Sequence, residues 1–170
     1  MGLDITAYQQ WKLLGPVGDA DEDYDWKTEV RPYVDPEFPV HAEGVAPNSR
    51  YGFELSFRFR AGSYSGYSAW REELATFAGY PKVEHRNFLG NVVQTHTAGA
   101  WAAIEGPFWE LIHFSDCEGT IGPIVGKKLA HDFEVHRAAA AKVGGYFFDR
   151  YQEWEKAFQM AADGGAVCFH

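Results

Sequence analysis

The chain has 170 residues, of which 46% are hydrophobic and 16% aromatic, and this composition indicates one globular domain over residues 1–170. Its formal net charge of −9 disfavours duplex nucleic acid as a partner, although acidic mimicry of nucleic acid stays open. No stretch approaches the ~18 apolar residues of a membrane span, and the opening MGLDITAYQQ lacks the basic and apolar regions of a secretion signal. The two cysteines are too few for a disulfide framework, so we expect a cytoplasmic protein without a membrane partner.

The first fifty residues predict two strands separated by loops. Apolar and polar residues alternate over Gly2–Tyr8, as in a half-buried strand. Trp26–Val34 predicts an edge strand, because Pro32 cannot donate to a ladder. The acidic segment 15–25 and the proline-containing segment 35–50 are expected to be loops.

The clearest strand is expected over Tyr51–Arg60, followed by a helix over Ser68–Ala78. One face of this strand carries Phe53, Leu55, Phe57 and Phe59. Ser68 suits the N-cap of the helix, and Gly79 and Pro81 end it. The apolar stripe of the helix consists of Trp70, Leu74 and Phe77.

The segment 81–106 gives a mixed pattern, in which Val92–Thr95 is expected to be extended. Pro107 suits the first position of a short helix over residues 107–114, with Gly106 as its cap.

Two long helices and a closing strand are expected in the last third of the chain. The helices span Pro123–Val143 and Tyr146–Ala162, and the strand spans Ala166–His170. The core stripe of the first of these helices is expected to contain Ile124, Val125, Leu129, Phe133 and Val135. Strands and helices are largely segregated along the chain, which predicts an α+β fold with a mainly antiparallel sheet and three to four helices.

Three segments resemble motifs that bind a metal ion or phosphate, but their residues do not match the pattern that each motif requires. The acidic loop has the alternate aspartates of an EF-hand, but Tyr24 and Val30 stand where that motif needs Gly and Glu. GPIVGKK, residues 122–128, has too few residues between its glycines for a P-loop and lacks the following hydroxyl. His131 and His136 are out of register for a zinc-binding helix. We therefore expect no metal and no cofactor.

A hydrolase-like enzyme is one functional hypothesis, and its candidate residues are His113, Asp116, Cys117 and Glu118. Cys117 could be a nucleophile with His113 one helical turn before it, although flanking carboxylates disfavour the reactive thiolate. Asp116 and Glu118 could instead act with a histidine as general acid and base.

Two polar junctions, each before a helix, carry the leading hypothesis. GSYSGYS spans residues 62–68 and FSDCEGTIGP spans residues 114–123. Both are rich in Ser, Thr and Gly, and a helix start presents main-chain amides that bind anions. Ordinary cap and turn chemistry explains the same residues. Together the junctions predict a pocket for a small phosphorylated or nucleotide-type ligand.

The expected ligand residues divide by role. Hydroxyl donors are Ser63, Ser65, Ser68, Ser115 and Thr120. Rings that could stack on a base or sugar are Tyr64, Tyr67 and Trp70. Phosphate would pair with Arg58, Arg60 or Arg71, and ribose or base would donate to Asp116 and Glu118. On this hypothesis Arg71→Ala weakens binding without unfolding the domain.

Several blocks of the sequence resemble, in the same order, a family of small uncharacterised proteins of bacteriophages and bacterial chromosomes. The blocks are MGLDITAY, FRAGSYSGYSAWREELA, LIHFSDCEGTIGP with KLAHDFE downstream, and AADGGAVCFH. The resemblance implies a small cytoplasmic protein of phage origin and brings no catalytic residues with it. By analogy with small accessory phage proteins, it suggests a counter-defence factor that sequesters a signalling nucleotide.

A third hypothesis is an acidic inhibitor that binds a host protein, and oligomerisation also stays open. If the two junctions meet in one cleft, the ligand and enzyme hypotheses gain. If they lie on opposite faces, the inhibitor hypothesis gains.

Overall fold

The computed structural model describes residues 2–18, 24–114 and 118–170. Its centre is an antiparallel four-stranded sheet in the order β5–β1–β9–β8. The strands are β1 (Leu3–Gln9), β5 (Leu55–Gly62), β8 (Gly119–Ile121) and β9 (Ala166–Phe169). The N-terminal strand pairs with the C-terminal strand in this sheet, so the predicted α+β class is confirmed.

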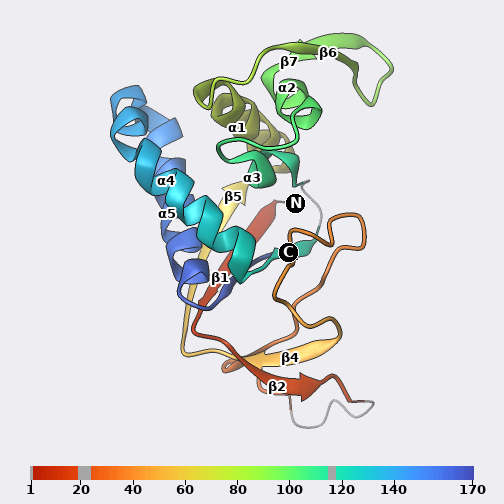
Figure 1. Cartoon of the computed structure of the whole chain (residues 1–170), viewed down its shortest axis with the longest axis vertical. Helices are drawn as coiled ribbons and strands as arrows, with labels where there is room; N and C mark the ends of the chain where they lie inside the picture. Colours follow the sequence, from red (N-terminus) through yellow and green to blue (C-terminus); the bar gives the residue numbers. More distant parts are fainter. Residues whose placement is uncertain (1, 19–23, 115–117) are drawn as a thin grey trace.

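Two long helices, α4 (Pro123–Val143) and α5 (Gly145–Ala162), cover one face of the sheet (Figure 1). Gly144 and Gly145 make the tight turn between them in left-handed conformations, with φ of 68° and 56°. Both helices were predicted within one residue. The expected core stripe of α4 is right for Val125, Leu129 and Phe133 but wrong for Ile124 and Val135, which face solvent.

Helix α1 (Tyr64–Phe77) begins one turn earlier than predicted. The N-cap is Ser63 rather than Ser68, because the Ser63 hydroxyl accepts a bond of 3.1 Å from the amide of Gly66. The helix ends before Gly79 as predicted, and Gly79 has a φ of 84°. Its apolar stripe buries Trp70 and Leu74 against the core.

The expected strand over Tyr51–Arg60 is wrong, because it consists of two strands in different sheets. The first is β4 (Ser49–Gly52), which lies between β2 (Lys12–Pro16) and the two-residue edge strand β3 (Glu29–Val30). The second is β5. The chain crosses between the sheets at Phe53 and Glu54. The Phe53 ring packs 4.6 Å from that of Tyr8, whereas Phe57 and Phe59 face the core under the helices.

The segment 81–106 folds as the hairpin of β6 (Val83–Arg86) and β7 (Val92–Thr95), followed by α2 (His96–Ala102). The extended segment Val92–Thr95 is confirmed, but its partner strand and α2 were not predicted. The next helix, α3 (Trp109–His113), starts later than expected. Its N-cap is Phe108, which has a φ of 56° and donates from its amide to Asp132 at 2.8 Å.

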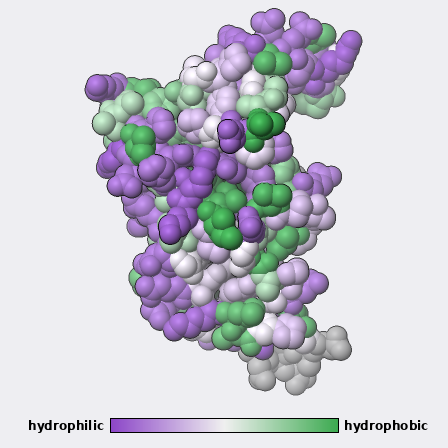
Figure 2. Space-filling view, in the orientation of Figure 1, coloured by the Kyte–Doolittle hydropathy of each residue, from purple (hydrophilic) through white to green (hydrophobic). Residues whose placement is uncertain are grey.

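The molecule is elongated, with the β6–β7 hairpin at one end and the β2–β4–β3 sheet at the other (Figure 1). Apolar patches interrupt a largely hydrophilic surface, including the end formed by the hairpin (Figure 2). Among the described helices, none combines the length and the apolar character needed to cross a bilayer.

Candidate functional site

A groove of about 690 Å³ lies between α1 and the β6–β7 hairpin with its following helix. We call it the hairpin groove. One wall comes from α1 and contains Tyr64, Ser65, Ser68, Arg71 and Glu72. The facing wall contains His85, Phe88, Thr95, Thr97 and Trp101. The structure therefore brings four of the predicted ligand residues together: Tyr64, Ser65, Ser68 and Arg71.

The hairpin turn is shaped by Asn87. Its side-chain oxygen accepts hydrogen bonds of 3.0 Å from the amides of Leu89 and Asn91. Gly90 adopts a φ of 79° within the same turn, which favours glycine there. This turn holds Phe88 in solvent, where its side chain is 95% exposed.

Glu72 fixes the hairpin side of the groove to α1. Its carboxylate accepts three hydrogen bonds of 2.6–2.8 Å from the first residues of α2, two from Thr97 and one from the amide of His96. Burial of this carboxylate opposes ionisation, but these hydrogen bonds outweigh it and hold the pKa of Glu72 below its ordinary value. Glu72 therefore ties the start of α2, on one wall of the groove, to α1 on the other.

Two buried nitrogen atoms in the groove residues lack a hydrogen-bond partner within the described part of the chain. They are Nε of Arg71 and Nδ1 of His85. The ring of His85 meets that of Trp101 edge-on at 5.5 Å. Buried polar atoms are nearly always paired, so these two nitrogens are exceptions within the described part of the chain.

Tyr67 and Trp70 do not reach the groove, contrary to the sequence-based expectation. Both rings are buried, and each lies 5.7 Å from the ring of Trp154 on α5. Tyr64 is exposed at the start of α1, and of the predicted stacking residues only Tyr64 lines the groove. The stacking surface opposite comes from Trp101, whose side chain is 44% exposed.

The second junction lies partly outside the described residues, which stop at Phe114 and resume at Glu118. Ser115, Asp116 and Cys117, and the predictions made for them, fall in that interval. Thr120 is buried in β8, where its hydroxyl lies 3.6 Å from Sγ of Cys168. Glu118 is exposed and lines a separate open hollow of about 520 Å³ with Asp35 and Glu37. Among the described residues, Glu118 and Thr120 therefore do not line the hairpin groove.

Both junctions nevertheless lie at the same end of the central sheet. The antiparallel order places the end of β5 and the start of β8 there, on opposite edges of the sheet. Two strands separate them, which corresponds to about 14 Å. Among the described residues, those predicted for the ligand thus lie in two places, the hairpin groove and the face of the sheet opposite α4 and α5 at this end.

On that face the register aligns side chains in two rows across the strands. The first row is Arg58, Thr6, Cys168 and Thr120. The second row is Arg60, Asp4 and His170, with Glu118 just before the start of β8. Three residues predicted for the ligand, Arg58, Arg60 and Glu118, thus share one face, with both arginines on β5 and Glu118 across the sheet beside β8.

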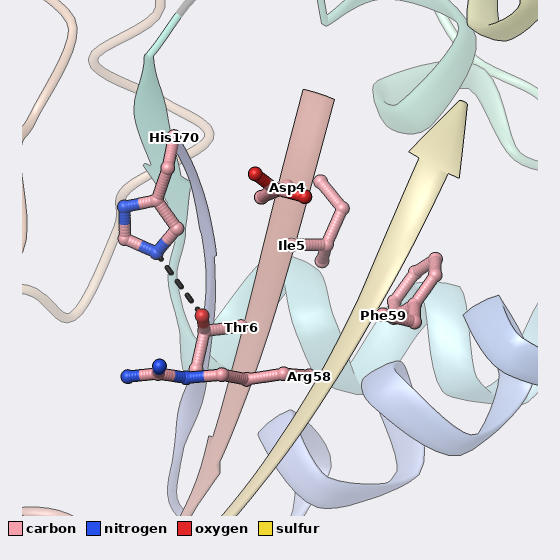
Figure 3. Close-up of a pocket in the computed structure, with 6 residues that line it drawn as sticks. All are labelled: Asp4, Ile5, Thr6, Arg58, Phe59 and His170. Carbon is pink, nitrogen blue, oxygen red and sulfur yellow. Dashed lines mark hydrogen bonds between the residues drawn. The ribbon is translucent and has the colours of Figure 1, made fainter. Parts of the chain in front are cut away.

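A pocket of about 440 Å³ opens between these rows and is lined by Asp4, Thr6, Arg58 and His170, among others. We call it the sheet-face pocket (Figure 3). Nε2 of His170 lies 3.2 Å from the hydroxyl of Thr6, and the Arg58 side chain extends across β1 on the same side. Burial lowers the pKa of His170 and Arg58 adds to this effect, whereas Glu118 and Asp4 act against it.

His113, the histidine of the catalytic hypothesis, lies in an aromatic cluster. Its ring stacks on Trp109 at 4.7 Å and lies 6.0 Å from the ring of the buried His41. Burial lowers the pKa of His113. Within the described residues no hydrogen bond joins His113 to Glu118, and no group of three or more His, Cys, Asp or Glu side chains could hold a metal ion.

Sequence reasoning missed the facing wall of the groove and most of the sheet-face pocket. The run VEHRNFLGNVVQT carries turn residues between two β-prone segments and could have indicated the hairpin. The alternation over Gly2–Tyr8 placed Asp4 and Thr6 on its polar face. Only the pairing of β1 with β9 brings His170 beside them.

Comparison of the chain with protein-family models, curated proteins and solved structures found no match. The resemblance to small phage and bacterial proteins therefore stays an expectation.

Proposed function

We propose that the protein binds a small phosphorylated or nucleotide-type ligand in the hairpin groove. The observation that carries this proposal is a groove whose lining combines the basic side chain of Arg71 with aromatic rings and hydroxyls. A volume of about 690 Å³ is within the range of about 300–1,000 Å³ that is usual for small-ligand pockets.

The roles follow from the chemistry of each wall. A base or sugar would stack between Tyr64 and Trp101, because both rings are partly exposed at the groove. Ser65 and Ser68 are exposed on α1 and would donate from their hydroxyls. Arg71 supplies the positive charge for a phosphate. Glu72 competes little for it, since its carboxylate is already bonded to the start of α2.

A protein that holds such a ligand without converting it lowers the free concentration of the ligand. This role agrees with the sequestering function that the resemblance suggests, and with a cytoplasmic location where nucleotides are present. The sequestering function and the cytoplasmic location are parts of this proposal.

Native mass spectrometry of the protein as purified from cells is the first test, followed by denaturation and identification of any released molecule. Titration with adenosine monophosphate, a cyclic dinucleotide and ribose 5-phosphate follows. Stacking contributes about 1–3 kcal/mol per base, so Trp101→Ala should weaken binding of a nucleotide by about 5-fold to 150-fold. Trp26→Ala is the matched control, because Trp26 is an exposed tryptophan outside the groove.

The proposal fails if no probe binds and no molecule is released, or if Trp101→Ala binds as tightly as the wild type. A probe recovered chemically altered would support the enzyme hypothesis instead. A bare protein that captures a defined host protein would support the inhibitor hypothesis.

A further inference from the structure

The sheet-face pocket offers a positive charge that the described structure leaves without a counter-ion. Arg58 is exposed, and among the described residues it forms no ion pair. Its side chain crosses β1 beside Thr6 (Figure 3). A guanidinium presents several N–H donors in one plane, an arrangement that matches the oxygens of a carboxylate or phosphoryl group.

Thr6 and His170 supply hydrogen bonds next to this charge. The Thr6 side chain is only 3% exposed, and its hydroxyl lies 3.2 Å from Nε2 of His170. A hydroxyl has one proton and two lone pairs. When Nε2 of His170 donates to Oγ1, the Thr6 proton can be donated to a group in the pocket in place of the neighbouring Tyr8 hydroxyl. The pair therefore positions a hydroxyl donor on the side of the sheet where Arg58 lies.

The charges around the pocket limit the charge of the ligand. Arg58 and Arg60 contribute two positive charges, and Asp4 and Glu118 on the neighbouring row contribute two negative charges. These four charges sum to zero, so attraction to the arginines and repulsion from the carboxylates nearly balance for any anion. The cost of removing an ion from water rises more steeply than its charge, so a singly charged oxyanion enters such a pocket at a lower cost than a dianion.

We propose that the sheet-face pocket binds a singly charged oxyanion, a carboxylate or a phosphodiester group, through Arg58 with Thr6 and His170 as hydrogen-bond partners. The pocket shares no lining residue with the hairpin groove. The proposal therefore goes beyond the proposed function and does not depend on it.

The test is a titration followed by NMR spectra of the histidine side chains, with the His170 signals assigned from the His170→Gln variant. Acetate and dimethyl phosphate are the two probes, and sodium chloride at equal ionic strength is the control. We expect saturable shifts of the His170 signals with at least one probe. A negative charge beside the ring should also raise the pKa of His170, which Arg58, Asp4 and Glu118 already influence.

Arg58→Gln removes the charge but keeps a polar side chain at an exposed position, and it should weaken probe binding about tenfold or more. Thr6→Val keeps the branched shape of the buried side chain and should weaken binding less. Arg86→Gln in the hairpin is the matched control and should bind as the wild type does. Trp101→Ala should also leave the His170 shifts unchanged, which separates this site from the hairpin groove.

The two probes distinguish the sources of the anion. If only acetate saturates the site, the ligand is a carboxylate. If only dimethyl phosphate does, the ligand is a phosphodiester. If both do, the site recognises the oxyanion that the two groups share. Three outcomes would overturn the proposal: shifts that sodium chloride reproduces, unchanged affinity in Arg58→Gln, or tighter binding of inorganic phosphate dianion at pH 8 than of either probe.

Discussion

Arg71 holds the fold together as well as lining the groove. Its Nη1 donates to the carbonyl of Phe114 at 2.7 Å, and the side chain is only 8% exposed. Arg71→Ala leaves this carbonyl without its donor, so we expect the free energy of unfolding to fall by about 1–3 kcal/mol. Arg71→Ala is therefore expected to lower stability as well as to weaken binding, so binding by this variant has to be measured where it remains folded.

Ser68→Ala is the comparison for Arg71→Ala, because Ser68 is exposed on the same helix. It should change the free energy of unfolding by no more than about 0.5 kcal/mol. Urea denaturation of both variants measures the difference. Equal stability of the two would mean that the contact of Arg71 with Phe114 contributes nothing.

His41 makes the stability of the fold depend on pH. Burial lowers the pKa of His41 from 6.5 to about 4, although the carbonyl of Glu110 and the charge of Asp35 act against it. The unfolded chain therefore binds a proton near pH 6.5, and the folded chain does so only near pH 4. The stability from this group is complete above pH 6.5 and is lost as the pH falls toward 4.

His41→Gln removes this titration and keeps an amide that can donate to Glu110. Between pH 7 and 4.5 the variant should lose less stability than the wild type, by on the order of 2 kcal/mol. Urea denaturation at several pH values measures both curves. Parallel curves would show that another group causes the acid sensitivity.

At the scale of elements, α4 and α5 pack closely together at Gly126. A Cβ atom there would lie 2.8 Å from Cβ of Ala161. Helix propensity alone predicts that Gly126→Ala stabilises the protein by up to about 1 kcal/mol. Overpacking costs about 1–3 kcal/mol, so we expect net destabilisation. In a double-mutant cycle with Ala161→Gly, the second change should relieve the first. Additive effects would exclude this steric contact.

Elements with local signals were predictable from the sequence, and elements defined by distant partners were not. Helix α4 begins with Pro123 and ends before Gly144, so local residues indicate both of its ends. The alternation over Tyr51–Arg60 was correct as a pattern. It could not reveal that the chain changes sheets at Phe53, because both sheets bury alternate residues.

At the scale of the whole molecule, the candidate sites depend on contacts between distant parts of the chain. Arg58 and His170 are brought to one pocket only because β1 lies between β5 and β9. The groove likewise needs Glu72 to hold the start of α2. Composition and spacing singled out the first junction, of which Tyr64, Ser65 and Ser68 line the groove. They could not supply the pairing order of the sheet, which arises from long-range contacts.

The β6–β7 hairpin should be the part of this architecture that opens most easily. It forms a two-stranded sheet at one end of the molecule, and such a hairpin has little stability of its own. Strand β1 is paired on both sides in the central sheet. In hydrogen–deuterium exchange, the amides of Val83–Arg86 and Val92–Thr95 should therefore exchange well before those of Leu3–Gln9. Equal protection would mean that Glu72 and α2 couple the hairpin to the core as one unit. A ligand in the hairpin groove should slow exchange in the hairpin and leave β1 unchanged, because the hairpin contributes residues to that groove and β1 contributes none.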